Sequence, residues 1–131
     1  MAAICGRGGK VIAGTKTCAH IGEWTMSIPG VEPEDITSLG ATAKAFLACT
    51  LPGPATGTCT WKALDNADEG AAAVRAAVLA GTSIALDLYE SATKFWDGAD
   101  AYITNFSQTV GVDGPVGGSF DFQFATIPTY T

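Results

Sequence analysis

The sequence offers few residues that could support catalysis. His20 is the only histidine, so a Ser-His-Asp or Cys-His arrangement would have to include it. The surrounding TCAHIGEW is typical of a strand and has no nucleophile-elbow pattern. We therefore predict that His20 is a hydrogen-bonded residue of a sheet. A small hydrolase built around His20 remains a third alternative for the function.

Acidic residues cluster in two places, around Glu32, Glu34 and Asp35, and at Asp97 and Asp100. A glycosidase needs two carboxyl groups facing one cleft, whereas turn-forming neighbours favour solvated turns at both places. The DNADEG segment resembles the start of a calcium loop but lacks the glutamate that closes such a loop. We predict no enzymatic activity, no cofactor and no metal site.

The four cysteines do not have the spacing of a metal site. Cys5, Cys18, Cys49 and Cys59 are separated by 13, 31 and 10 positions, with no CxxC pair. We favour small buried apolar side chains for them. Disulfide bonds remain open, because four cysteines permit three pairings that the sequence cannot rank.

The charge of the chain excludes a protein that binds nucleic acid tightly through the phosphate backbone. The net charge is −6, and nine of the 13 acidic residues follow Ala63, where only Arg75 and Lys94 are basic. Tight phosphate binding needs clustered Lys and Arg, so this surface would repel DNA. No apolar run approaches the length of a membrane span, and MAAICGRGGK lacks the apolar core of a secretory signal.

The C-terminal third, Gly81 to Thr131, has the alternation of strands that are buried on one face and wet on the other. In the first of these strands, one face carries Ile84, Leu86 and Leu88, and the opposite face carries Ala85, Asp87 and Tyr89. In the last strand, one face carries Phe120, Phe122 and Phe124, and the opposite face carries Ser119, Asp121 and Gln123.

Strands also precede the one helix that the sequence predicts. Thr17 to Ile28 alternates as a strand, and TGTCTWKAL does the same. The helix covers about residues 67–80, with Asn66 or Asp68 as N-cap and Gly81 closing it. Strands, one helix and strands predict a mostly β fold: a β-sandwich or barrel with one flanking helix, in a single domain of residues 1–131. Residues 1–10 are expected to be a flexible arm.

Residues 31–54 are irregular and unusually apolar for a connection. A segment this long between two strands is typically functional or disordered, and ATAKAFLACTLPGP is compatible with helix or strand. We predict a projecting hairpin or loop that packs on something else.

Several segments together resemble the tail tube proteins (major tail proteins) of tailed phages. GEWTMSIPGVEPEDITSLG resembles the N-terminal signature of that family. Three further segments follow in the same order as in that family. They are a Thr-x-Trp strand, an acid-capped helix ending in AGT, and a closing block of the form G-x-A-Y-I-T-x-F-S-x-x-V-x-V-D-G that ends in S-F-x-F-Q. The resemblance covers roughly residues 20 to 125.

The resemblance implies a structural virion protein. Such proteins form hexameric rings in which strands of neighbouring subunits join into a barrel, and the rings stack into the channel for DNA ejection. Expected partners are further copies of the chain, the tape measure, tail terminator and distal tail proteins, and DNA that passes without specific binding; no membrane is involved. The expected location is the virion tail, assembled in the host cytoplasm.

Two groups of residues are assigned from these expectations. Polar residues facing away from the core would line the channel, namely Glu23, Thr25, Ser27, Thr58, Thr60, Ser119, Asp121 and Gln123. Residues of the long loop would contact another subunit or ring, namely Glu32, Glu34, Asp35, Lys44, Phe46, Leu47 and Leu51.

The alternative function is a small β-sandwich module that binds carbohydrate or a cell-surface receptor. Phe95, Trp96 and Tyr102 lie near an Asp-Gly pair and could form a stacking platform for a sugar. Aromatic residues flanking a hairpin are, however, more often cross-strand packing pairs.

Overall fold

The structure is a computed structural model, and it describes residues 8–30, 33–40, 42–48, 54–64 and 67–131. Its elements are β1 (Lys10–Ala13), β2 (Lys16–Thr17), β3 (Ile21–Ser27), β4 (Pro33–Asp35), β5 (Phe46–Ala48), β6 (Thr56–Trp61), α1 (Glu69–Ala80), β7 (Ile84–Tyr89), β8 (Phe95–Thr109), β9 (Gly117–Phe124) and β10 (Thr129–Tyr130).

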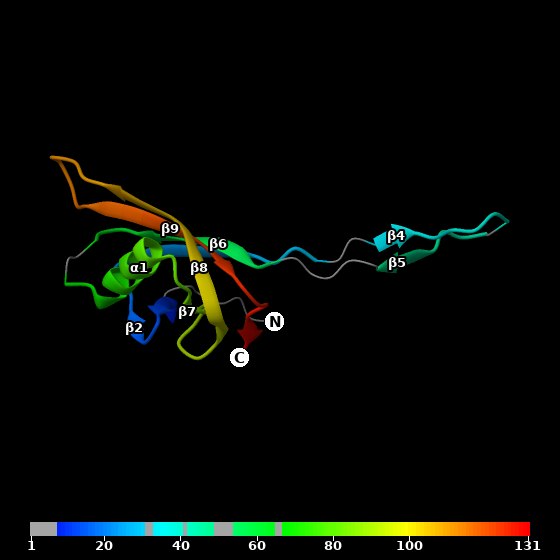
Figure 1. Cartoon of the computed structure of the whole chain (residues 1–131), viewed down its shortest axis with the longest axis horizontal. Coiled ribbons are helices and arrows are strands. Elements are labelled where there is room, and N and C mark those ends of the chain that lie inside the picture. Colours follow the sequence, from blue (N-terminus) through cyan, green and yellow to red (C-terminus); the bar gives the residue numbers. More distant parts are fainter. Residues whose placement is uncertain (1–7, 31–32, 41, 49–53, 65–66) are drawn as a thin grey trace.

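Eight of the strands form one continuous antiparallel sheet (Figure 1). Their order is β2-β1-β7-β8-β9-β6-β3, and β10 pairs with the start of β8. The 15-residue strand β8 connects the two halves of the sheet, because its first half pairs with β7 and its second half pairs with β9. The predicted mostly β fold with one flanking helix is confirmed.

The core lies between the two halves of this sheet, with α1 packed beside them. The indole Nε1 of Trp24 on β3 donates to the carbonyl oxygen of Tyr89 on β7 at 2.9 Å, which joins the two halves directly. The buried side chains of the strands include Val11, Cys59, Trp61, Leu86, Leu88, Ile103, Phe120, Phe122 and Phe124. Burying each phenylalanine contributes about 2 kcal/mol to folding, so β9 is a central stabilising strand.

Helix α1 ends where its sequence predicts and begins at Glu69, two residues after the predicted start. Asp68 is the N-cap, and its buried carboxylate accepts hydrogen bonds from the backbone N–H groups of Gly70 and Ala19, both at 3.0 Å. The second bond attaches the helix start to the turn after β2. Gly81 closes the helix in the left-handed conformation, with φ 69°, which glycine adopts without strain.

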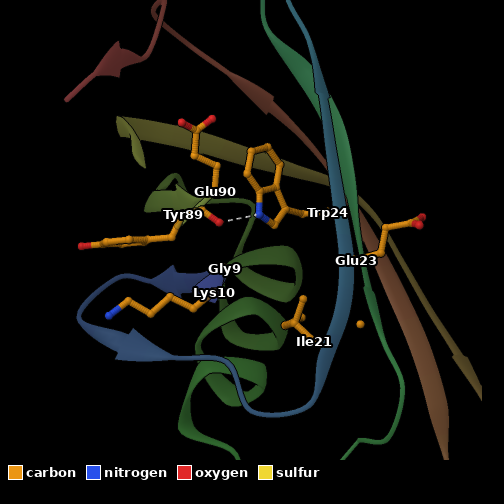
Figure 2. Close-up of a pocket in the computed structure, with 8 residues that line it drawn as sticks. Gly9, Lys10, Ile21, Glu23, Trp24, Tyr89 and Glu90 are labelled. Carbon is orange, nitrogen blue, oxygen red and sulfur yellow. Dashed lines mark hydrogen bonds between the residues drawn. The ribbon is translucent and has the colours of Figure 1, made fainter. Parts of the chain in front are cut away.

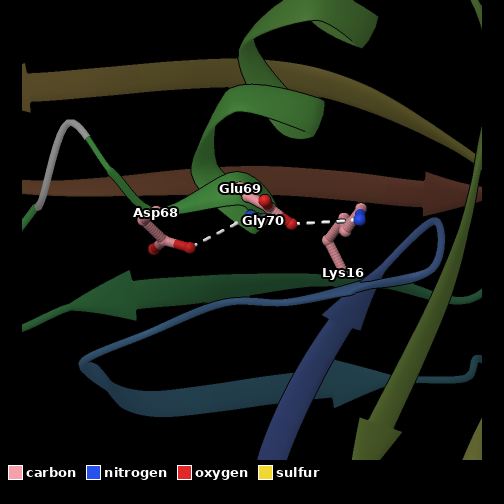
Figure 3. Close-up of polar contacts among 4 residues, drawn as sticks. All are labelled: Lys16, Asp68, Glu69 and Gly70. Atoms are coloured by element: carbon pink, nitrogen blue, oxygen red, sulfur yellow. Dashed lines mark hydrogen bonds and ion pairs between the residues drawn. The ribbon is translucent and has the colours of Figure 1, made fainter.

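An ion pair adds to this attachment on the surface (Figure 3). Lys16 Nζ of β2 lies 3.0 Å from a carboxylate oxygen of Glu69, the first residue of α1. Both side chains are more than half exposed, so the pair contributes less than about 1 kcal/mol. The buried Asp68 cap is therefore the more important of the two contacts.

The predicted strand from Thr17 to Ile28 is interrupted, and the prediction for His20 is wrong. Ala19 and His20 form a turn between β2 and β3, where His20 is exposed and has a left-handed φ of 58°. Only the backbone of His20 joins the sheet, since its carbonyl oxygen accepts from Lys62 N at 2.8 Å. The Asp68 carboxylate bound to Ala19 N holds this turn in place.

Residues 33–48 contain the projecting hairpin that the sequence predicts. Strands β4 and β5 form a separate two-stranded antiparallel sheet, which extends far from the body of the molecule (Figure 1). Pro33 pairs with Ala48 and Asp35 with Phe46. The segment that was compatible with helix or strand therefore contributes a strand.

Candidate functional site: the polar face of a four-stranded sheet

The second half of the large sheet has one apolar and one polar face. Strands β3, β6, β9 and β8 are consecutive neighbours, and their register aligns polar residues in three rows that cross all four strands. The rows are Ser27–Thr56–Gln123–Tyr102, Thr25–Thr58–Asp121–Asn105 and Glu23–Thr60–Ser119–Ser107. All eight residues that the sequence assigned to a channel lie on this face.

The burial of neighbouring residues fixes which way the polar face points. Phe120, Phe122 and Phe124 alternate with Asp121 on β9 and are at most 1% exposed. Figure 2 shows Trp24 and Glu23 pointing to opposite sides of β3, with Trp24 directed inward. The predicted assignment of the two faces is therefore correct, and the polar rows lie on the outside of the subunit.

The polar face carries negative charge. Its three rows contain two carboxylates, those of Glu23 and Asp121, and no basic residue. Asp121 lies near the middle and accepts a hydrogen bond from Thr58 Oγ1 at 2.7 Å, which holds its carboxylate against the sheet. Small hydroxyl and amide side chains surround it, so the face is polar and acidic.

Both lateral edges of this four-stranded sheet lack a partner strand within the described part of the chain. Strand β3 pairs with β6 alone. Residues 102–109 of β8 pair with β9 alone, because β7 and β10 lie beside residues 95–101 only. Exposed backbone N–H and C=O groups at such edges are ready to pair with another chain.

Sequence reasoning missed the contribution of β8 to this face. Tyr102, Asn105 and Ser107 complete the three rows, but a register shift between Ile103 and Asn105 interrupts the alternation along β8. Thr56 was also missed, although it is the first residue of the predicted strand TGTCTWKAL. Only the pairing of β8 with β9 shows that these residues belong to the polar face, and no local sequence pattern reveals that pairing.

The predicted loop residues form a second site, away from the polar face. Asp35 and Lys44 are exposed on the hairpin, whereas Glu32 and Leu51 lie outside the described residues. For Glu34, Phe46 and Leu47 the structure describes the backbone, as part of β4 and β5.

Threonine hydrogen bonds order the hairpin beyond its two short strands. Thr37 N donates to Asp35 Oδ1 at 2.9 Å, and Ala45 N donates to Thr37 Oγ1 at 2.8 Å. The bonds from Thr37 hold the pKa of Asp35 below its usual value. Ile36 is half exposed and Leu39 is fully exposed, so the hairpin offers apolar side chains to a partner.

The described cysteines are structural in character. Cys18 and Cys59 are buried and free, as predicted, while Cys5 and Cys49 lie outside the described residues. Burial, and then the Asp68 carboxylate, raises the pKa of Cys18 to about 12, and burial also raises the pKa of Cys59. Thiols that stay protonated are poor nucleophiles and poor metal ligands.

The aromatic platform of the alternative function does not form. Trp96 packs against the core and pairs with Leu88, whereas Tyr102 lies on the polar face opposite Gln123. Phe95 stacks on Tyr89, with ring centroids 4.4 Å apart. The Asp97-Gly98 pair is part of β8 and not a turn.

Two features are absent from the described residues. No group of three or more His, Cys, Asp and Glu side chains is placed to hold a metal ion within the described ranges. Among the same residues, no helix has the length and apolar character needed to span a membrane.

Comparison with known proteins finds the same fold in tail structures. No family model matches the sequence, and no curated protein matches it. A chain in the virion of a native gene transfer agent particle superposes with a TM-score of 0.79 at 16% identity, over 98% of this chain and 99% of that one. A chain in the tail of an empty gene transfer agent particle with C6 symmetry gives 0.70 at 18% identity, over 88% and 85%.

The third similar structure is a tail tube. The SPP1 tail tube, solved by solid-state NMR and electron cryo-microscopy, matches with a TM-score of 0.75 at 16% identity, over 98% of this chain and 79% of that one. The fold of this chain is therefore that of tail tube proteins. The resemblance inferred from the sequence motifs is confirmed at the level of fold.

Proposed function

We propose that this protein is a structural, non-enzymatic virion protein that forms the tail tube, as hexameric rings stacked around a channel for DNA. One observation carries the proposal: a four-stranded sheet has an acidic outer face and, among the described residues, no partner strand on either edge. The tail-tube fold, found also in a tail with C6 symmetry, supports it.

Ring formation follows from the two edges. Strand β3 is antiparallel to β6, β6 to β9, and β9 to β8, so β3 and β8 run in opposite directions. The β8 edge of one subunit can therefore pair with the β3 edge of the next in regular antiparallel order. Six such head-to-tail contacts close into a barrel and remove every exposed edge.

The polar face then lines the channel. In a closed barrel the apolar face remains in the subunit cores and the three polar rows face the lumen. Sixfold repetition converts Glu23 and Asp121 into two rings of six carboxylates. Such a lining repels phosphate groups, so DNA moves through it without adhering.

The projecting hairpin is the element that connects rings. Ile36 and Leu39 are exposed on a hairpin that extends beyond the body of the subunit, and burying them on a neighbouring ring would stabilise the stack. At its ends the tube would meet the tail terminator and distal tail proteins, and inside it the tape measure protein. Assembly would take place in the host cytoplasm, and the product would be the virion tail.

Native mass spectrometry and negative-stain electron microscopy of the purified protein test this function. We expect hexamers at low concentration and tubes at high concentration. A protein that stays monomeric at every concentration would contradict the proposal and favour the alternative binding module, which a glycan array then tests.

A further inference from the structure

A pocket of about 450 Å³ lies beside the free edge of β3 (Figure 2). It is bounded by the start of β1, the start of β3 and the end of β7. Ile21 and Trp24 point into it from β3, while Glu23 points away toward the polar face. The lining residues that matter here are Lys10, Ile21, Trp24, Tyr89 and Glu90.

Two large apolar side chains of this pocket, those of Ile21 and Trp24, are incompletely buried. Ile21 and Trp24 pack against the core but are only partly buried in the subunit. The Tyr89 ring adds to the apolar wall, and Lys10 Nζ lies 4.5 Å from the centroid of that ring. Strand β3 has no strand on its outer edge within the described residues, so no neighbouring strand covers the part of these side chains that stays exposed.

An apolar side chain is exposed just past the end of β8. Val110, the residue after β8, is 70% exposed, and Val112 is fully exposed. Phe106 on β8 pairs with buried Phe120 and so faces the core. Alternation from Phe106 through residue 108 places Val110 on the same side. Val110 thus lies on the core-facing side of β8, past the end of the strand and separated from Phe106 by Gln108.

We propose that the pocket beside β3 is the socket for Val110 of the adjacent subunit in the ring. The inference rests on the proposed ring. Antiparallel pairing of β3 with the neighbour's β8 brings the end of that β8 beside the start of β3, where the pocket lies. Val110 then contacts Ile21 and Trp24, and the apolar layers of two subunits become continuous beneath the polar lining.

A matched pair of variants measures the contact. Val110→Ser removes an apolar side chain that is exposed in the subunit, so the melting temperature of the dissociated subunit should not change. The critical concentration for tube assembly should rise about tenfold, the loss expected for one buried valine contact. Leu79→Ser, at an 87% exposed leucine on α1, is the control and should assemble as the wild type does.

Cross-linking locates the contact. With p-benzoylphenylalanine in place of Val110, irradiated assemblies of mixed ¹⁴N- and ¹⁵N-labelled protein should yield peptides that join position 110 to residues 21–24 or Tyr89 of a different subunit. The socket proposal would be overturned by cross-links within one chain or to another surface. It would also be overturned if Val110→Ser assembled at the same critical concentration as the wild type. Tubes formed by the wild type in those experiments would leave the ring proposal standing, whereas wild-type protein that never assembles would overturn both.

Discussion

Asp87 of β7 lies directly opposite Asp97 of β8. Like charges in a directly opposed cross-strand pair are destabilising. Burial, and then the hydrogen bond and charge of Asp97, raises the pKa of Asp87 to about 6. Asp87 Oδ1 is also buried without a hydrogen-bond partner within the described structure. The pair is therefore a strained point of an otherwise regular strand pairing.

Stability of the dissociated subunit should consequently fall between about pH 4 and pH 6. A folded-state pKa above the unfolded value of 3.8 means that the native state binds more protons in this window, so its contribution to stability is lost as the pH rises. Asp97→Asn removes the repulsion. We expect it to raise the free energy of unfolding by about 1 kcal/mol at pH 7, after solvent screening, and to change it little at pH 4.

Urea denaturation at the two pH values checks this expectation. Asp113→Asn, at an exposed acid in the turn between β8 and β9, removes the same charge elsewhere and controls for net charge. Equal stabilisation by both variants, or an effect of Asp97→Asn that is larger at pH 4, would show that the Asp87–Asp97 pair is not the cause.

Gly98 is one of the glycines whose replacement should damage the fold. A Cβ at this position would lie 2.0 Å from a ring carbon of Phe124, deep in the core. Gly98→Ala should cost about 3 kcal/mol of unfolding free energy, at the upper end for overpacking. Gly117→Ala, where a Cβ would meet nothing within 4 Å, is the control in β9. A thermal melt that ranks the two variants equally would contradict the packing described for β8 and β9.

Reversing the charge of Asp121 should make the channel adhesive. Tubes of Asp121→Lys should retain labelled DNA at about 50 mM salt and release it at about 200 mM, because phosphate contacts weaken steeply with ionic strength. Asp121→Asn also changes the acceptor of the Thr58 hydrogen bond but adds no positive charge, so its tubes should not retain DNA. Retention by both variants, or by neither, would argue against a lumen position for Asp121.

Removing the β4–β5 hairpin should prevent the rings from stacking while the subunit still folds. Ser27 and Thr56 face each other in the β3–β6 pair, so a short Gly-Ser linker in place of residues 29–54 can close the chain. Among the residues of that segment whose burial is described, none belongs to the buried core. The melting temperature of the subunit should therefore stay close to that of the wild type. Electron microscopy should show single rings or monomers. Normal tubes would exclude the hairpin as the connector between rings.

Local patterns in the sequence predicted the elements whose alternation or caps are unbroken. Phe120, Phe122 and Phe124 alternate without a bulge, so their burial and the exposure of Asp121 followed from period two alone. Asp68 and Gly81 defined both ends of α1 because each satisfies a specific requirement of a helix terminus.

The features that local sequence patterns did not predict depend on contacts between residues far apart in the chain. The turn at His20 has no glycine to mark it and depends on Asp68, 49 positions from Ala19. Register shifts in β8 near Gly98 and Ile103 separated Trp96 from Tyr102 and obscured the polar residues of that strand. The two free edges became visible only when the order of all strands was known.

A high-resolution helical reconstruction of the assembled protein tests the central claim most directly. The account predicts sixfold rings in which β3 of each subunit pairs with β8 of its neighbour, with Asp121 and Glu23 facing the channel. Rings closed through other strands, or a polar face of β3, β6, β9 and β8 directed to the outside of the tube, would contradict it.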